Sequence, residues 1–206
     1  MVKKSERTEI TSDEIVDLRP LPMVAPHGNS AFVTGVYRIN ESVSYPEYQT
    51  SASGCLDLAA DLGTHNAFLK YWDTNMGREG NKGIRDDSTG RHILIEPGDR
   101  VLIPTGLIFQ FCDGWSMKTF IRSSVGLKKG LMLANGVGYI DEDYRNELFL
   151  PIINMSRCQV RVEDKERLAQ GEVCPTVQTV LRVLDNRPPL TGNRIGGFGS
   201  TNSINK

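Results

Sequence analysis

The sequence predicts an all-β domain, folded as a sandwich or a barrel. From Ala31 onward, short runs rich in β-branched and aromatic residues recur, and turn residues separate nearly all of them. The chain has 206 residues, enough for one substantial hydrophobic core, so one domain is expected. In chain order, the predicted strands lie within AFVTGVYRI, GCLDLAA, HILIEPG, RVLIPTGLIFQF, SMKTFIR, GLMLA, ELFLPIINM, CQVRV and TVQTVLRVL.

Three segments depart from this pattern and set the expected domain limits. Residues 1–30 mix charges with prolines and a glycine, which is typical of a loosely attached N-terminal arm. Residues 64–91 are polar and Gly-rich apart from AFLKYW, which predicts an insertion loop carrying one short helical turn. Residues 186–206 contain a Pro-Pro pair and then a Gly-rich tail, which predicts a flexible C-terminal arm. The β domain is therefore expected to span residues 31–185.

Charge and cysteine content exclude several classes of protein. The 24 Lys and Arg residues balance 25 Asp and Glu residues, so the chain has no global electrostatic footprint for nucleic acid or for a membrane surface. No run of about 18 apolar residues is present to cross a bilayer. The four cysteines lack CxxC spacing, which argues against a zinc or redox motif. We expect a cytoplasmic protein with no nucleic-acid or membrane partner.

The segment LMLANGVGYIDEDYRNE, residues 131–147, combines a turn signal with an acidic cluster. Its Asn135-Gly136 pair tolerates positive φ angles and predicts a tight hairpin turn. Asp141 and the two carboxylates after it follow an apolar Ile140, and like charges so close destabilise a fold unless something uses them. Deprotonation of a water by Asp141 is one such use. The alternative is a solvated turn.

The segment RSSVG has the groups that bind phosphate. Arg122 supplies a guanidinium fork, Ser123 and Ser124 supply hydroxyl groups, and Gly126 allows unusual backbone angles. The alternative is an ordinary polar turn, since serine pairs favour turns.

The tail RIGGFGST has two readings as well. Phe198, which follows Gly197, can stack on a flat base, and Arg194 can reach a terminal phosphate with two hydrogen bonds. The composition alone is that of a terminus without fixed structure. An arm that orders over a bound ligand would act as a lid.

Five segments in chain order resemble the five motifs of the trimeric deoxyuridine triphosphatases (dUTPases). A similar strand-turn-strand, IEPGDRVLIPTGL, lies between the first and second of them, as it does in that family. One departure falls in the fourth segment, where Lys165 and Glu166 stand at positions commonly occupied by Gly and Asp. The five segments are SGCLDLAADL, RSSVGLKKG, NGVGYIDEDYRNEL, DKERLAQGEV and RIGGFGST.

The resemblance implies a jelly-roll-like β barrel, assembled as a homotrimer with composite sites, that hydrolyses dUTP to dUMP and diphosphate with Mg²⁺. By family role, Asp141 would be the general base, and Tyr144 would stack on the deoxyribose and exclude a 2′-hydroxyl. Asn135 would read the uracil edge, because a carboxamide presents both a donor and an acceptor. Asp57 would act on the metal through its water shell. Substrate binding is further implied for Arg122, Ser123, Ser124, Gly126, Tyr139, Arg167, Gln170, Arg194, Gly197 and Phe198.

Two alternatives stay open at this point. A dCTP deaminase shares the fold and the RSS sequence, but the DEDYR run and the GGFGS arm resemble dUTPase features. The other is a nucleotide-gated binding protein with a regulatory protein partner. Residues 64–91 and the N-terminal arm would then carry the contacts.

Overall fold

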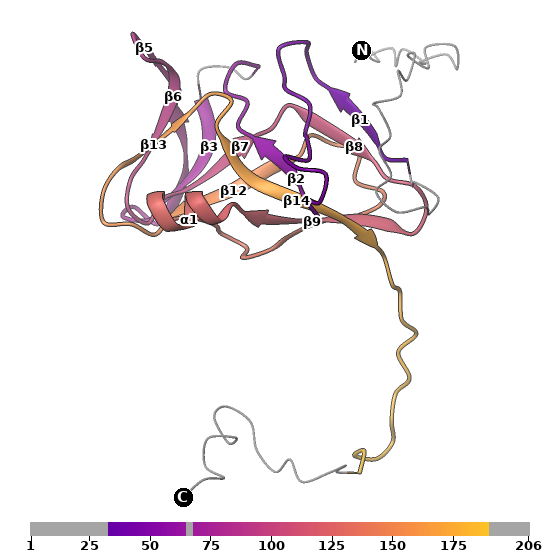
Figure 1. Ribbon diagram of the computed structural model, residues 1–206. Helices are drawn as coiled ribbons and strands as arrows, with labels where there is room; N and C mark the ends of the chain where they lie inside the picture. The colour runs from indigo at the N-terminus through magenta and orange to yellow at the C-terminus, as the bar shows by residue number, and fades with distance from the viewer. Residues whose placement is uncertain (1–32, 65–67, 190–206) are drawn as a thin grey trace, which may run out of the picture. The chain divides into compact units, whose positions relative to one another are not determined.

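The computed structural model describes residues 33–64 and 68–189 of the chain. Within these ranges the chain forms fourteen strands and one short helix, α1 (Ser123–Lys129), which confirms the all-β prediction (Figure 1). The strands are β1 (Gly35–Arg38), β2 (Leu56–Ala59), β3 (Phe68–Asp73), β4 (Arg78–Gly83), β5 (Arg85–Asp87), β6 (Gly90–Ile95), β7 (Arg100–Pro104), β8 (Leu107–Gln110), β9 (Trp115–Ile121), β10 (Leu131–Leu133), β11 (Gly138–Ile140), β12 (Phe149–Asn154), β13 (Val160–Glu163) and β14 (Arg167–Pro175).

The strands pair antiparallel in four sheets. The largest has the order β10-β12-β7-β3-β4, and a second has the order β11-β9-β14-β2. Two smaller sheets have the orders β13-β6-β5 and β1-β8. Apart from the β3-β4 hairpin, neighbours in the larger sheets are not consecutive in the sequence, so the contacts that build the fold are mostly non-local.

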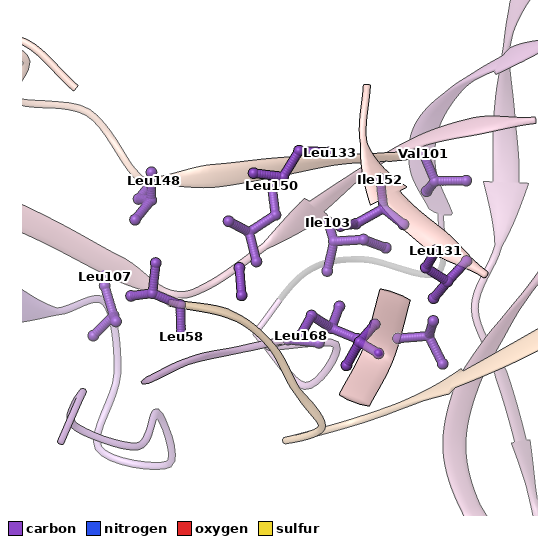
Figure 2. Close-up of a cluster of buried hydrophobic side chains, with 14 of the residues drawn as sticks. Leu58, Val101, Ile103, Leu107, Leu131, Leu133, Leu148, Leu150, Ile152 and Leu168 are labelled. Carbon is purple, nitrogen blue, oxygen red and sulfur yellow. The ribbon is translucent and has the colours of Figure 1, made fainter. Parts of the chain in front are cut away.

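One apolar core joins strands from both larger sheets (Figure 2). Side chains alternate between buried and partly exposed along β12, as expected for a strand with one face against a core. Ile152 on β12 and Val101 on β7 lie in register across the sheet, and both are buried. The buried cluster that Figure 2 labels is Leu58, Val101, Ile103, Leu107, Leu131, Leu133, Leu148, Leu150, Ile152 and Leu168.

The prediction of a loop with a helical turn at residues 64–91 was wrong, because most of this segment forms strands. β3 and β4 form a hairpin there, β3 also pairs with β7, and β5 pairs with β6. Leu69 is buried between exposed Phe68 and Lys70, which is the alternation of a half-buried strand. The polar composition hid β4, because this strand lies at a sheet edge and needs few apolar residues.

The Asn135-Gly136 turn forms, but it does not close a hairpin. Gly136 has a φ of +75°, and its N–H donates to the Leu133 carbonyl at 2.9 Å. The strands on either side separate, because β10 pairs with β12 whereas β11 pairs with β9. The turn therefore carries the chain from one sheet to another. The dipeptide fixes the local bend and leaves strand pairing undetermined.

Residues 177–206 form a second unit of the chain, of which 177–189 are described. The described part contains neither helix nor strand, so the prediction of a strand in TVQTVLRVL, residues 176–184, was wrong, and β14 ends just before it at Pro175. An extended segment needs a neighbouring strand to satisfy its backbone groups, and none is paired with it here. Among the residues that the structure describes, no helix is long and apolar enough to cross a membrane.

Candidate active site

Four parts of the chain meet at a hollow of about 290 Å³. β14 pairs with β2 on one side and with β9 on the other, and Gln170 on β14 lies opposite Asp57 on β2. Helix α1 follows β9 directly, and a backbone bridge between Glu47 and Asp57 brings the segment 47–55 to the same place. The hollow is lined by Gln49, Ser53, Gly54, Cys55, Asp57, Arg122, Ser123, Ser124 and Gln170.

Asp57 is the electrostatic centre of this hollow. Its Oδ1 lies 3.2 Å from Arg122 Nε, and its Oδ2 lies 3.1 Å from Arg167 Nη1. The Asp57 side chain is only 8% exposed, so its charge is largely shielded from water. One carboxylate and two guanidinium groups leave a net positive charge at the wall of the hollow. Such a wall attracts anions.

The RSSVG segment is the start of a helix, not a free loop. The Arg122 N–H donates to the Leu168 carbonyl at 3.0 Å, and Val125 is buried, so both ends of the segment are fixed. Ser123 and Ser124 occupy the first two positions of α1 and line the hollow. Gly126 lies in α1 and does not line it. A Cβ added at Gly126 would meet nothing closer than 3.8 Å.

The fourth predicted motif begins with a strained turn. Lys165 has a φ of 62°, in the left-handed region, at a position where the dUTPases commonly have glycine. This conformation costs a non-glycine residue about 1–2 kcal/mol. Two contacts offset the cost, since Lys165 Nζ pairs with Asp61 Oδ1 at 2.6 Å and the Lys165 N–H donates to the Ala60 carbonyl at 2.9 Å. Arg167 then starts β14 in register with Ala59.

The other predicted residues of the third motif do not line this hollow. Asn135, Tyr139, Asp141 and Tyr144 lie on or next to β11, which is at the opposite edge of the four-stranded sheet from β2. Three strand spacings separate these edges, roughly 14 Å. Of the residues predicted to hold phosphate, the structure thus brings together Arg122, Ser123, Ser124 and Gln170 within one chain, and it leaves the predicted base apart from them.

The segment after β11 is held by its own contacts. The Tyr144 hydroxyl donates to the Glu147 carbonyl at 2.9 Å, and Glu142 Oε2 accepts a hydrogen bond from the Gly114 N–H at 2.7 Å. The Tyr139 hydroxyl lies 2.7 Å from Ser116 Oγ. Asp141 is exposed in the part of the single chain that the structure describes.

Arg194, Gly197 and Phe198, predicted to contact the substrate, lie outside the described residues.

Sequence analysis missed four residues that line the hollow: Gln49, Ser53, Gly54 and Cys55. The signal was weak, because the preceding stretch PEYQTSASG looks like an ordinary polar loop. Burial, followed by the negative charges of Glu172 and Asp57, raises the pKa of the Cys55 thiol. Cys55 therefore lines the hollow as an uncharged thiol at neutral pH.

The described residues offer no cluster of three or more metal-binding side chains. Mg²⁺ needs few protein ligands when it grips phosphate oxygens and keeps its waters. Asp57, the residue predicted to act on its water shell, already forms an ion pair through each oxygen and lies between two cations. This environment does not fit a carboxylate that serves a metal.

Comparison with known proteins agrees with this arrangement. The dUTPase family model matches residues 86–202. The chain is 32% identical over 173 residues to the deoxyuridine 5'-triphosphate nucleotidohydrolase of Bartonella bacilliformis, covering 78% of this chain and 84% of that protein. It is also 32% identical over 171 residues to the enzyme of the same name from Chlamydia abortus, covering 82% and 98%.

A solved structure gives the same answer for the fold. The dUTPase from Streptococcus mutans superposes with a TM-score of 0.52 at 26% identity, covering 71% of this chain and 98% of that one. The jelly-roll-like β barrel predicted from the resemblance is thereby confirmed. From the matched family model and the relatives, the chain belongs to the dUTPase family.

Proposed function

We propose that the chain hydrolyses dUTP to dUMP and diphosphate, which lowers dUTP and supplies dUMP. The observation that carries the proposal is the hollow, where Arg122 lies beside the hydroxyl groups of Ser123 and Ser124 and the amide of Gln170. Arg167 does not line the hollow, but it pairs with Asp57 in its wall. Guanidinium groups match phosphate oxygens in geometry and charge, and hydroxyl and amide groups add neutral donors. A triphosphate is the ligand that uses all of them.

The proposed reaction is attack of a water on the α-phosphorus. Asp141 takes the proton from this water, and the arginines and serines hold the leaving diphosphate. The phosphate-binding groups are preorganised, since β14, β9 and α1 fix them in the chain without a ligand. Mg²⁺, when bound, would neutralise charge on the triphosphate. It would be carried chiefly by the phosphates and waters, because Asp57 is engaged by the two arginines.

We infer a homotrimer with composite sites, and the separation of β11 and β2 supports this assembly. If Asp141 and the phosphate-binding hollow act on one substrate, different subunits must supply them. Exposed apolar side chains support this assembly, including Met132, Val137, Val180 and Leu181. Sedimentation equilibrium should give three times the 22.9 kDa chain mass, and a species of one chain mass would contradict the assembly.

The proposed activity is tested with a panel of nucleoside triphosphates. Diphosphate release with Mg²⁺ should be fast for dUTP and slow for dCTP, dTTP and UTP. Ammonia release from dCTP would assign the chain to the deaminase branch instead. Tight dUTP binding without diphosphate release would favour a nucleotide-gated binding protein.

Tyr144→Ala should lower the preference for dUTP over UTP by about tenfold. The Tyr144 ring is proposed to press on the deoxyribose, so its removal makes room for a 2′-hydroxyl. Competition between dUTP and UTP, measured as a ratio of kcat/KM values, checks this. Tyr144→Phe is the matched control, because it keeps the ring and loses only the hydrogen bond to the Glu147 carbonyl. An unchanged ratio in Tyr144→Ala would remove the sugar-gate role.

A further inference from the structure

We propose that Asp57 serves this reaction by positioning Arg122 and Arg167, and that Gln49 is a second positioning residue for Arg167. The inference rests on the proposed function, because it concerns how the same hollow holds the triphosphate. It replaces the role expected for Asp57 at the water shell of a metal.

The geometry assigns one carboxylate oxygen to each arginine. Oδ1 of Asp57 faces Arg122 Nε at 3.2 Å, and Oδ2 faces Arg167 Nη1 at 3.1 Å. The carboxylate itself is held firmly, since β2 places it opposite Gln170 and the Asp57 N–H donates to the Glu47 carbonyl at 3.0 Å. A fixed carboxylate with both oxygens occupied determines where both guanidinium groups point.

The two arginines need this counterion to stand side by side. Arg122 Nη1 donates to the Arg167 backbone carbonyl at 3.3 Å, so Arg122 also contacts its neighbour directly. Without the negative charge of Asp57, the two guanidinium groups would repel each other and turn toward solvent. With the Asp57 carboxylate present, the three side chains together carry one net positive charge, and both guanidinium groups stay in place. This order comes from contacts among the protein's own side chains and backbone.

Arg167 depends on side-chain contacts more than Arg122 does. Its side chain is 47% exposed, against 27% for Arg122. Besides Asp57, it donates through Nη1 to Gln49 Oε1. Gln49 lines the hollow and lies outside the five dUTPase-like segments. An amide oxygen at this point restrains the guanidinium without adding a charge that would repel phosphate.

The test is calorimetric binding of α,β-imido-dUTP, a nonhydrolysable analogue, with Mg²⁺ and again in EDTA. Asp57→Asn keeps the shape of the side chain and removes its charge. We expect it to weaken binding about tenfold in both conditions. We also expect the effect to become smaller in the Arg167→Ala background, where only Arg122 is left to position, because residues that act through one another are not additive.

Three results would overturn the role of Asp57. Asp57→Asn could weaken binding only with Mg²⁺, which would assign Asp57 to the metal. Asp57→Asn could instead tighten binding in EDTA, which would show that the Asp57 charge only weakens the attraction of the hollow for anions. The wild type could bind only with Mg²⁺, which would show that the arginines alone are not preorganised. Failure of the wild type to bind in either condition would instead refute the proposed function.

Gln49→Ala tests the second residue and keeps the proposal falsifiable if Asp57→Asn does not fold. It should weaken binding about threefold in EDTA and have no effect when Arg167 is already alanine. Gln159→Ala is the control, since Gln159 is exposed, contacts Glu96 and lies outside the hollow. Equal affinities for Gln49→Ala and the wild type would refute the role of Gln49.

Discussion

Asp141→Asn is expected to bind dUTP as the wild type does and to turn it over about 10² to 10⁴ times more slowly. A general base contributes an acceleration of this size, and asparagine cannot accept the proton of the attacking water. Binding is spared because the phosphate-binding groups lie at β2, β14 and α1, at the other edge of the sheet. Steady-state diphosphate release gives kcat, and calorimetry with α,β-imido-dUTP gives the affinity.

Asp143→Asn is the matched control for this variant. Asp143 is exposed, carries the same charge and lies in the same acidic run, so it should keep most of its activity. If both variants lose turnover equally, the effect belongs to the field of the cluster and not to one base. Turnover above a tenth of the wild-type value in Asp141→Asn would remove Asp141 from that role.

Ile152→Ala is expected to lower the free energy of unfolding by about 2–5 kcal/mol. Ile152 is fully buried on β12, which is paired on both sides, by β10 and by β7. Truncation removes apolar contacts and leaves a cavity in the cluster of Figure 2, which a strand held on both sides cannot close. Urea denaturation measures the loss. The protein concentration must be held fixed, because subunit association contributes to the measured stability.

Ile153→Ala is the control for the core variant. Ile153 is the next residue on the same strand, but its side chain is only partly buried. A strand points successive side chains to opposite faces, so the same chemical change is made outside the cluster. A smaller loss is expected, and equal losses in the two variants would show that the cavity is not the cause.

The sequence was sufficient for the all-β class, because β-branched runs and turn residues are local signals. It was insufficient for β3 and β4, whose polar residues satisfy an edge hairpin without an apolar stripe. The Asn135-Gly136 dipeptide gave a correct turn and a wrong pairing, since φ preferences act over a few residues. Strand partners depend on contacts across the whole chain.

The same distinction applies to the candidate site. Motif resemblance placed Asp57, Arg122 and Gln170 in one site, and the structure brings them to one hollow. The resemblance did not reveal that Asp57 forms ion pairs with two arginines. That contact joins residues 65 and 110 positions away from Asp57, and side-chain composition carries no information about it. Gln49 was missed because it belongs to no recognised segment.

The hydrogen bond from the Thr176 N–H to the Gly114 carbonyl, at 2.7 Å, sets the reach of the chain that follows. β14 is paired with β9 up to Pro175, so residues beyond Thr176 start from this anchor. Eighteen residues separate Thr176 from Arg194, and a chain of this length can extend roughly 60 Å. A compact domain of this size is only roughly 40 Å across. A fully extended segment of this length is therefore longer than the domain is wide.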